Sequence, residues 1–199
     1  MKRRLICLAL ALITTACANI PPSYKFDPSA SEGLIIGSIT YDSTFGLYAL
    51  KLTPPPSVTE PKVDVGYSMW PPLSPMYDDQ LKAKGGTFAV SVPAGVYRIR
   101  GWKIEQGYRV RESSAPIDLE FTVEAGKAIY LGNLHFSRKQ EASLRDRSER
   151  DLPVLQAKYA VLKTAPLTSS IEAGVDLQDV GGRFRQHWDP VYIRIPTTR

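Results

Sequence analysis

The chain has 199 residues, 43% of them hydrophobic and 23% charged, which is enough for one domain with a substantial core. Its formal net charge is +5, but three basic residues lie before Cys17, and the remaining 22 basic against 20 acidic residues leave +2. A nearly neutral domain has no electrostatic basis for binding nucleic acid, so we exclude that class of partner.

The first 16 residues have the three parts of a secretion signal. Lys2, Arg3 and Arg4 precede the apolar run 5–13, and small residues then precede Cys17. A helix of this length spans about 14 Å, roughly half of the ~30 Å hydrocarbon core, so it is too short to cross a membrane. We therefore predict a lipoprotein signal peptide over residues 1–16.

The segment 13–17 resembles the lipobox of bacterial lipoproteins, although Thr14 stands where leucine is usual. The resemblance implies that Cys17 receives diacylglycerol, becomes the first residue of the mature chain and is then acylated with a fatty acid such as palmitate. An ordinary signal peptide that is cut elsewhere is the alternative. Lipidation accounts for both cysteines, because Cys7 leaves with the leader and no thiol remains for a disulfide or a metal.

The residues after the cysteine indicate where the anchor lies. Ala18 and Asn19 are not the aspartate associated with retention in the inner membrane, so we expect the outer membrane, facing the periplasm or the cell surface. Residues 17–32 are rich in proline, serine and alanine and have no apolar period. They are predicted to form the lipidated cysteine and a flexible tether, with the fold starting near Gly33.

Four runs typical of β-strands follow within residues 33–137. The runs 33–41 and 45–52 are rich in β-branched and aromatic residues, and the Asp-Ser-Thr between them predicts a hairpin. The segments 87–105 and 117–136 alternate apolar and polar residues. Such closely spaced strand signals predict a mainly β fold, an antiparallel β-sandwich of transthyretin-like or immunoglobulin-like type.

Two Ala-Gly turns repeat one pattern. The tripeptides 93–95 and 124–126 each follow a Phe-x-Val segment and precede a tyrosine. Pro93 suits the second position of a type I turn, and glycine accepts positive φ at the end of such a turn. We predict bulged hairpin turns with positive φ at Gly95 and Gly126; the alternative is that Ala-Gly pairs recur by chance.

After Phe136 the sequence becomes strongly charged and changes its period. Apolar residues now recur at helical spacing: Leu152, Leu155, Tyr159 and Leu162. This pattern predicts an amphipathic helix from about Glu149 to Lys163, with Pro153 in its first turn. Residues 138–199 are therefore expected to form a C-terminal helix and an extension that pack on the sandwich.

These turns and this helix resemble those of a broad group of uncharacterised bacterial lipoproteins. The shared pattern is a P-A-G-x-Y turn, an x-A-G-K turn, a Y-x-G strand and a C-terminal helix, and it covers roughly residues 33–163. The resemblance implies a transthyretin-like or carboxypeptidase-regulatory-like β-sandwich. Its motifs consist of turn and core residues, so it implies no chemistry.

The sequence predicts no catalytic, cofactor or metal site. His135 and His187 are the only histidines and lie far apart, so no zinc-ligand spacing is present. No serine lies in a Gly-x-Ser-x-Gly turn. Paired glycosidase carboxylates leave no local pattern, and in that weak sense the candidates are Asp78, Asp79, Asp118 and Glu120.

Two features predict a partner-binding surface. The connection 53–80, inside a Pro-rich insertion at 53–85, holds seven prolines and five large anchors: Tyr67, Met69, Trp70, Met76 and Tyr77. We expect it to lie outside the main sheet; the alternative is that it covers one end of the sandwich and buries Trp70. The second feature is a row of residues two apart on one strand, which predicts that they point outward together: Arg98, Arg100 and Trp102.

Together these features favour a non-enzymatic, outer-membrane-anchored module that binds a protein or a glycan. One alternative is a lipoprotein component of a secretion machine, since type VI systems use a transthyretin-like outer-membrane lipoprotein. The other is a periplasmic hydrolase acting on glycan or peptide. Clustered carboxylates or a Ser/His pair in a cleft would favour the hydrolase.

Overall fold

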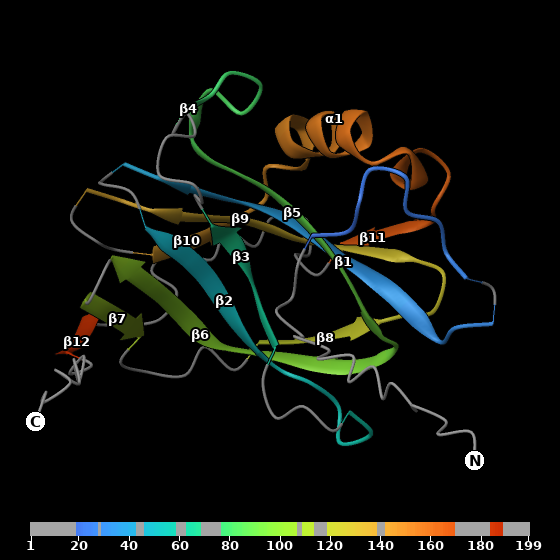
Figure 1. Cartoon of the computed structure of the whole chain (residues 1–199), viewed down its shortest axis with the longest axis horizontal. Coiled ribbons are helices and arrows are strands. Elements are labelled where there is room, and N and C mark those ends of the chain that lie inside the picture. The colour runs from blue at the N-terminus through green and yellow to red at the C-terminus, as the bar shows by residue number, and fades with distance from the viewer. Residues whose placement is uncertain are drawn as a thin grey trace, which may run out of the picture.

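The computed structural model describes most of the chain: residues 19–27, 29–42, 46–58, 63–68, 77–106, 109–113, 119–138, 142–169 and 184–188. Cys17, the predicted lipid anchor, lies outside these residues, as do Asp118 and the predicted anchors Met69, Trp70 and Met76. The described chain is mainly β, as predicted, and its strands form two sheets that pack face to face (Figure 1).

The first sheet has the strand order β10-β9-β1-β5-β4, with β11 beside β9. Its strands are β1 (Glu32–Tyr41), β4 (Tyr77–Asp78), β5 (Ala83–Pro93), β9 (Ala128–Phe136), β10 (Ala142–Arg145) and β11 (Leu167–Ser169). The central strand β1 is antiparallel to β5 but parallel to β9, and β11 is also parallel to β9. This sheet is therefore mixed, whereas the sequence predicted antiparallel pairing throughout.

The second sheet has the order β12-β7-β6-β2-β3, with β8 beside β6. Its strands are β2 (Leu47–Thr53), β3 (Val63–Ser68), β6 (Gly95–Gln106), β7 (Arg109–Ser113), β8 (Leu119–Val123) and β12 (Phe184–Trp188). All of these pairings are antiparallel. The sequence correctly predicts strands here but does not predict how they are shared between sheets.

The connection 53–80 enters both sheets, so the prediction that it lies outside them was wrong. β3 pairs with β2, and β4 pairs with the start of β5. The prolines of this connection stand before and after the run 63–68, which contains none. Every residue of β3 therefore keeps the N–H that ladder pairing needs, and the prolines do not prevent it from forming a strand.

The predicted hairpins connect the two sheets instead. β1 and β2 lie in different sheets, as do β5 and β6, and β8 and β9. Turn residues set local dihedral angles, but they do not determine whether the next strand folds back beside its predecessor or crosses to the other sheet. The crossing is decided by pairings between strands that lie far apart in the sequence, such as β1 with β9.

The two Ala-Gly turns nevertheless correspond structurally. Gly95 has φ 152° and Gly126 has φ 70°, so the predicted positive φ is confirmed at both. The start of β1 holds both turns: the Ala94 N–H donates to the Ser31 carbonyl and the Gly126 N–H to the Glu32 carbonyl, each at 2.8 Å. The repeat in the sequence thus marks two crossovers at the same end of the molecule.

A shared apolar core fills the space between the sheets, and Trp102 lies in it with 0% exposure. The prediction that Trp102 points outward with Arg98 and Arg100 was therefore wrong. Lys51 pairs with Gly101 and the next residue, Leu52, pairs with Ile99, so Arg100 is the extra residue of a β-bulge. A bulge shifts the inward and outward alternation by one residue, which turns the Trp102 side chain into the core.

The helix α1 (Ser148–Lys158) lies over the outer face of the first sheet and is followed by the 3-10 turn η1 (Ala160–Lys163) (Figure 1). Tyr159, with φ −123° and ψ 105°, separates them, so the helical stretch is not continuous to Lys163. A second apolar cluster fills the space beneath: Ile20, Leu34, Ile36, Ala89, Ala128, Tyr130, Leu155, Tyr159 and Leu162. None of the helices in the described part of the chain has the length and hydropathy to span a bilayer.

Residues 19–27 pack against this second cluster, where the sequence predicted a flexible tether. The Asn19 Oδ1 atom accepts a hydrogen bond from the Ala89 N–H at 2.7 Å, and the Ile20 N–H donates to the Ala89 carbonyl at 2.8 Å. Ile20 is 6% exposed, and Tyr24 and Phe26 are partly buried against the same cluster. Both backbone pairing and apolar burial therefore hold the segment on β5 and α1.

Candidate functional site

A buried carboxylate forms the centre of the most extensive group of polar side chains in the described residues. Asp151, in the first half of α1, is 0% exposed. It accepts hydrogen bonds from the Ser38 hydroxyl at 2.6 Å and from the Tyr130 hydroxyl at 2.7 Å. The Arg150 guanidinium donates to its other oxygen at 2.8 Å and forms an ion pair with it. Both carboxylate oxygens therefore accept hydrogen bonds from neighbouring donors.

The network continues from Ser38 to the surface along β1 and β9. The Asn133 amide donates to the Ser38 hydroxyl at 2.7 Å and to the Thr40 hydroxyl at 3.2 Å. The Thr40 hydroxyl is 2.9 Å from Nδ1 of His135, and Nε2 of that ring lies 3.7 Å from an Asp42 carboxylate oxygen. This chain of contacts exists because Ser38 and Thr40 lie beside Asn133 and His135 in the parallel register of the two strands.

The protein environment shifts the pKa values of two members of this network. Burial raises the pKa of Tyr130, and the charge of Asp151 raises it further, so its hydroxyl remains a donor at physiological pH. Burial lowers the pKa of His135 below 6.5; Asp42 opposes this effect, while Arg145 and Arg150 add to it. The imidazole is therefore neutral at pH 7.

The geometry of this network is that of a helix attachment. Ser38, whose hydroxyl contacts Asp151, and Thr40, whose hydroxyl contacts His135, are 0% and 2% exposed. Both are already bonded to neighbours within the network, so neither presents an oxygen to an outside substrate. Within the described ranges, no group of three or more His, Cys, Asp or Glu side chains is arranged to hold a metal ion.

The sequence analysis did not predict this network, although one signal was present. Asp151 lies four residues before Leu155, which places it on the apolar side of the helix rather than the charged side. Its neighbours Arg150 and Glu149 made the whole run appear solvated. The hydroxyls and amide of β1 and β9 carried no such signal, because their alignment depends on pairing between strands about 95 residues apart.

The structure separates the predicted partner-binding residues. Arg98 and Arg100 are exposed on the outer face of the second sheet, where Arg98 forms a 2.8 Å ion pair with Glu120 and Arg100 donates to Thr53 at 3.2 Å. Tyr77, 52% exposed, lies on β4 of the first sheet. Tyr67 is placed in β3 by its backbone alone.

Two of the weak carboxylate candidates, Asp78 and Glu120, have local roles, and Asp79 is exposed in the turn after β4. The Asp78 carboxylate accepts hydrogen bonds from the N–H groups of Gln80 and Leu81, each at 2.9 Å, and so stabilises the turn after β4. Glu120 pairs with Arg98 across β6 and β8. These contacts give the carboxylates of Asp78 and Glu120 a structural role.

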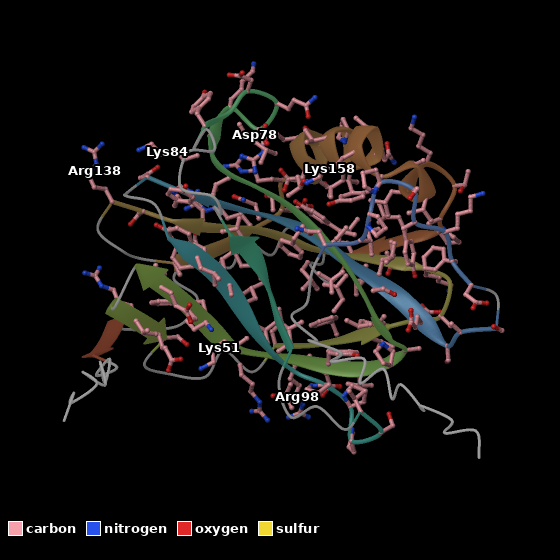
Figure 2. The ribbon with its side chains drawn as sticks, viewed as in Figure 1. Lys51, Asp78, Lys84, Arg98, Arg138 and Lys158 are labelled. Carbon is pink, nitrogen blue, oxygen red and sulfur yellow. The ribbon has the colours of Figure 1, made fainter. Side chains whose placement is uncertain are left out.

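Arg98 and Lys51 lie on the opposite side of the molecule from Lys158 of α1 (Figure 2). Ion pairs join opposite charges on the outer face of the second sheet: Lys51 of β2 is bonded to Glu112 of β7 at 3.0 Å, and Lys103 to Glu105 along β6 at 2.8 Å. The two broad faces of the molecule thus differ in character. One is an ion-paired sheet surface, and the other is covered by α1 and the N-terminal segment.

No protein-family model and no curated protein matches this chain. Among solved structures, it aligns with a leucine-rich repeat protein from Bacteroides thetaiotaomicron VPI-5482, with 16% sequence identity and a TM-score of 0.33. The alignment covers 65% of this chain but only 16% of the length of that protein. A likeness this weak bears on neither the fold nor the function.

Proposed function

We propose that this chain is a non-enzymatic lipoprotein, anchored in the outer membrane through Cys17, whose domain binds a protein or a glycan in the envelope. We also propose that its two sheets belong to the transthyretin-like or immunoglobulin-like type of sandwich, with α1 as the C-terminal amphipathic helix. The anchor is supported by the leader and the lipobox-like segment at residues 1–17.

One observation carries the non-enzymatic part of this proposal. The Ser38 and Tyr130 hydroxyls meet the Asp151 carboxylate beneath α1, and the Thr40 hydroxyl contacts the His135 imidazole further along β1 and β9. Asp151 and Ser38 are both 0% exposed, so this carboxylate and its serine lie inside the fold. Catalytic groups need contact with substrate, and these have contact with the protein instead.

The binding part of the proposal places the partner at the second sheet and the neighbouring connection 53–80. Arg98 and Arg100 are exposed there, and arginine is enriched at protein interfaces. The connection contributes further anchors of the kinds that dominate binding energy, including Trp70. Trp102 is not part of this binding surface, because its side chain lies in the core.

The anchor is tested by metabolic labelling with a radioactive or clickable fatty acid. The wild-type chain should carry the label and float with outer-membrane fractions, while Cys17→Ser should carry none. Label on the Cys17→Ser variant would show that the lipid, if any, is attached elsewhere.

Binding is tested by affinity capture from solubilised envelopes with the anchored protein as bait. Trp70→Ala should reduce recovery of the captured molecule while leaving the melting temperature nearly unchanged. Arg98→Ala with Arg100→Ala should reduce recovery as well. A large loss of stability in Trp70→Ala, with capture per folded molecule unchanged, would assign that side chain to the core.

A further inference from the structure

We propose that the face formed by α1, η1 and β11 rests on the lipid surface, and that the docked N-terminal segment holds it there. This inference rests on the lipid anchor at Cys17 proposed above. It adds an orientation, since a lipid anchor alone leaves a domain free to turn on its tether. Its partner is a bilayer surface that carries anionic headgroups.

The docked N-terminal segment keeps the proposed lipid anchor close to the domain. Asn19 is bonded to Ala89 through its side chain, and the next residue bonds through its backbone. Only Ala18 separates Asn19 from Cys17, and a fully extended chain spans at most about 3.6 Å per residue. The Cα atom of Cys17 therefore lies within roughly 7 Å of that of Asn19. The predicted flexible tether is almost entirely used in docking, so the lipid cannot extend far from the domain.

The surface near this anchor point is formed by α1 and η1. Ile20 packs in one apolar cluster with Leu155 of α1, Tyr159 and Leu162 of η1. Tyr24 joins the same cluster and bonds to Ser91 of β5 at 2.9 Å. The N-terminal segment therefore runs beside α1 and η1, on the side of the molecule opposite Lys51 and Arg98 (Figures 1 and 2).

This surface carries exposed lysines and an exposed leucine. Residues 152–169, the part of α1 after Asp151 together with η1 and β11, contain two lysines and no acid, and the exposed acids nearby in the sequence include Glu149 in the first turn of α1 and Asp27 of the docked segment. Lys158 and Lys163 are both exposed, as is Lys25 of the docked segment, and Leu167 of β11 is 42% exposed. Exposed lysines together with an exposed leucine on the same elements suit a surface of anionic headgroups over hydrocarbon. On the outer face of the second sheet, three cations are bonded to carboxylates: Lys51 to Glu112, Arg98 to Glu120 and Lys103 to Glu105.

The experiment places one fluorophore on each face of the full-length, lipidated protein. Thr164→Cys follows η1, and Thr122→Cys on β8 is the matched control, because both threonines are exposed and Cys17 is blocked by lipid. Each labelled protein is reconstituted in vesicles of phosphatidylethanolamine and phosphatidylglycerol that contain a headgroup-nitroxide lipid. The label at position 164 should be quenched several-fold more than the label at position 122. Equal quenching would overturn the proposed orientation.

A charge test distinguishes specific contact from mere proximity. Lys158→Glu with Lys163→Glu should reduce the quenching at position 164 several-fold, whereas Arg98→Glu with Arg100→Glu, an identical change in net charge, should not. If both pairs have the same effect, the face is not bound through its lysines and the proposal fails. Circular dichroism checks that all variants are folded.

Failure of this inference differs from failure of the anchor. If Cys17 carries no fatty acid, the proposed anchor is wrong, and the reach argument falls with it. If Cys17 is lipidated and position 164 is not quenched, only the orientation is wrong. Protection of position 164 from a water-soluble maleimide in native envelopes, without quenching in vesicles that contain no other protein, would also overturn it and indicate a protein on this face.

Discussion

At the scale of single residues, Asp151 determines how α1 attaches to the first sheet. A carboxylate removed from water is tolerated only when donors replace the lost hydration, and here Ser38, Tyr130 and Arg150 do so. The directional bonds fix one position of the helix, whereas the apolar cluster beside them would tolerate small shifts. A polar residue thus gives the attachment its geometry, and the neighbouring apolar residues give it burial.

Asp151→Ala should lower the free energy of unfolding by about 3–5 kcal/mol, because it leaves a guanidinium and two hydroxyls without their acceptor. The exposed Glu149, two residues earlier on the same helix, provides the control, and Glu149→Ala should change stability by at most about 1 kcal/mol. Urea unfolding measures both. Similar losses in the two variants would show that the network contributes little.

His135 should make the fold sensitive to acid. Burial holds its pKa below 6.5, so the folded state binds fewer protons at this site than the unfolded state does. Stability from this site is therefore fully present above about pH 7 and falls as the pH drops through 6.5 toward the lowered pKa. His135→Gln should flatten the difference in unfolding free energy between neutral and mildly acidic pH, as measured by urea titration. An unchanged pH dependence in that variant would assign the acid sensitivity to other groups.

At the scale of elements, a β-bulge and two glycine turns determine how the strands run and where Trp102 points. The bulge at Arg100 and Gly101 turns Trp102 inward, and the glycines at the turns let β1 hold both crossovers. A positive φ at glycine has different consequences at different sites. A positive φ is a strain for any residue with a Cβ atom, but some glycines also lie where a Cβ atom would have no space.

Gly85 and Gly126 separate these two effects. Gly126 has φ 70° and open space around it, so Gly126→Ala should cost about 1–2 kcal/mol from backbone strain alone. Gly85 has φ 133°, and an added Cβ atom would collide with the backbone oxygen of Ile39, so overpacking should add roughly 1–3 kcal/mol. Thermal unfolding should therefore rank Gly85→Ala well below Gly126→Ala. The reverse order would mean that β1 and β5 can separate at little cost.

At the scale of the whole molecule, the two sheets depend on each other because successive strands alternate between them. β1 and β2, β5 and β6, and β8 and β9 each connect one sheet to the other. Aromatic side chains join the sheets in the core. The Trp102 ring of the second sheet packs edge-on against the Phe136 ring of the first, with 5.4 Å between the ring centroids. Neither sheet can therefore keep its core if the other unfolds.

Trp102→Ala should lower the unfolding free energy by roughly 3–5 kcal/mol, the usual result of emptying a buried aromatic site. The loss should appear in one cooperative transition, with the same midpoint by far-UV and near-UV circular dichroism, because one core serves both sheets. Separate midpoints would show that the sheets unfold independently. A loss below about 1 kcal/mol would contradict the burial of this side chain.

The local sequence determined those features that depend on a few neighbouring residues. Alternating runs predicted the mainly β class, and the Ala-Gly pairs predicted positive φ at Gly95 and Gly126. The tertiary structure decided which sheet each strand joins, the parallel pairing of β1 with β9 and the inward turn of Trp102. It also decided the candidate site, since Asp151 meets Ser38 across 113 positions of sequence. Turn and strand preferences arise from steric effects within a few residues, whereas strand partners are chosen by burial and backbone pairing between segments that meet only in the folded chain.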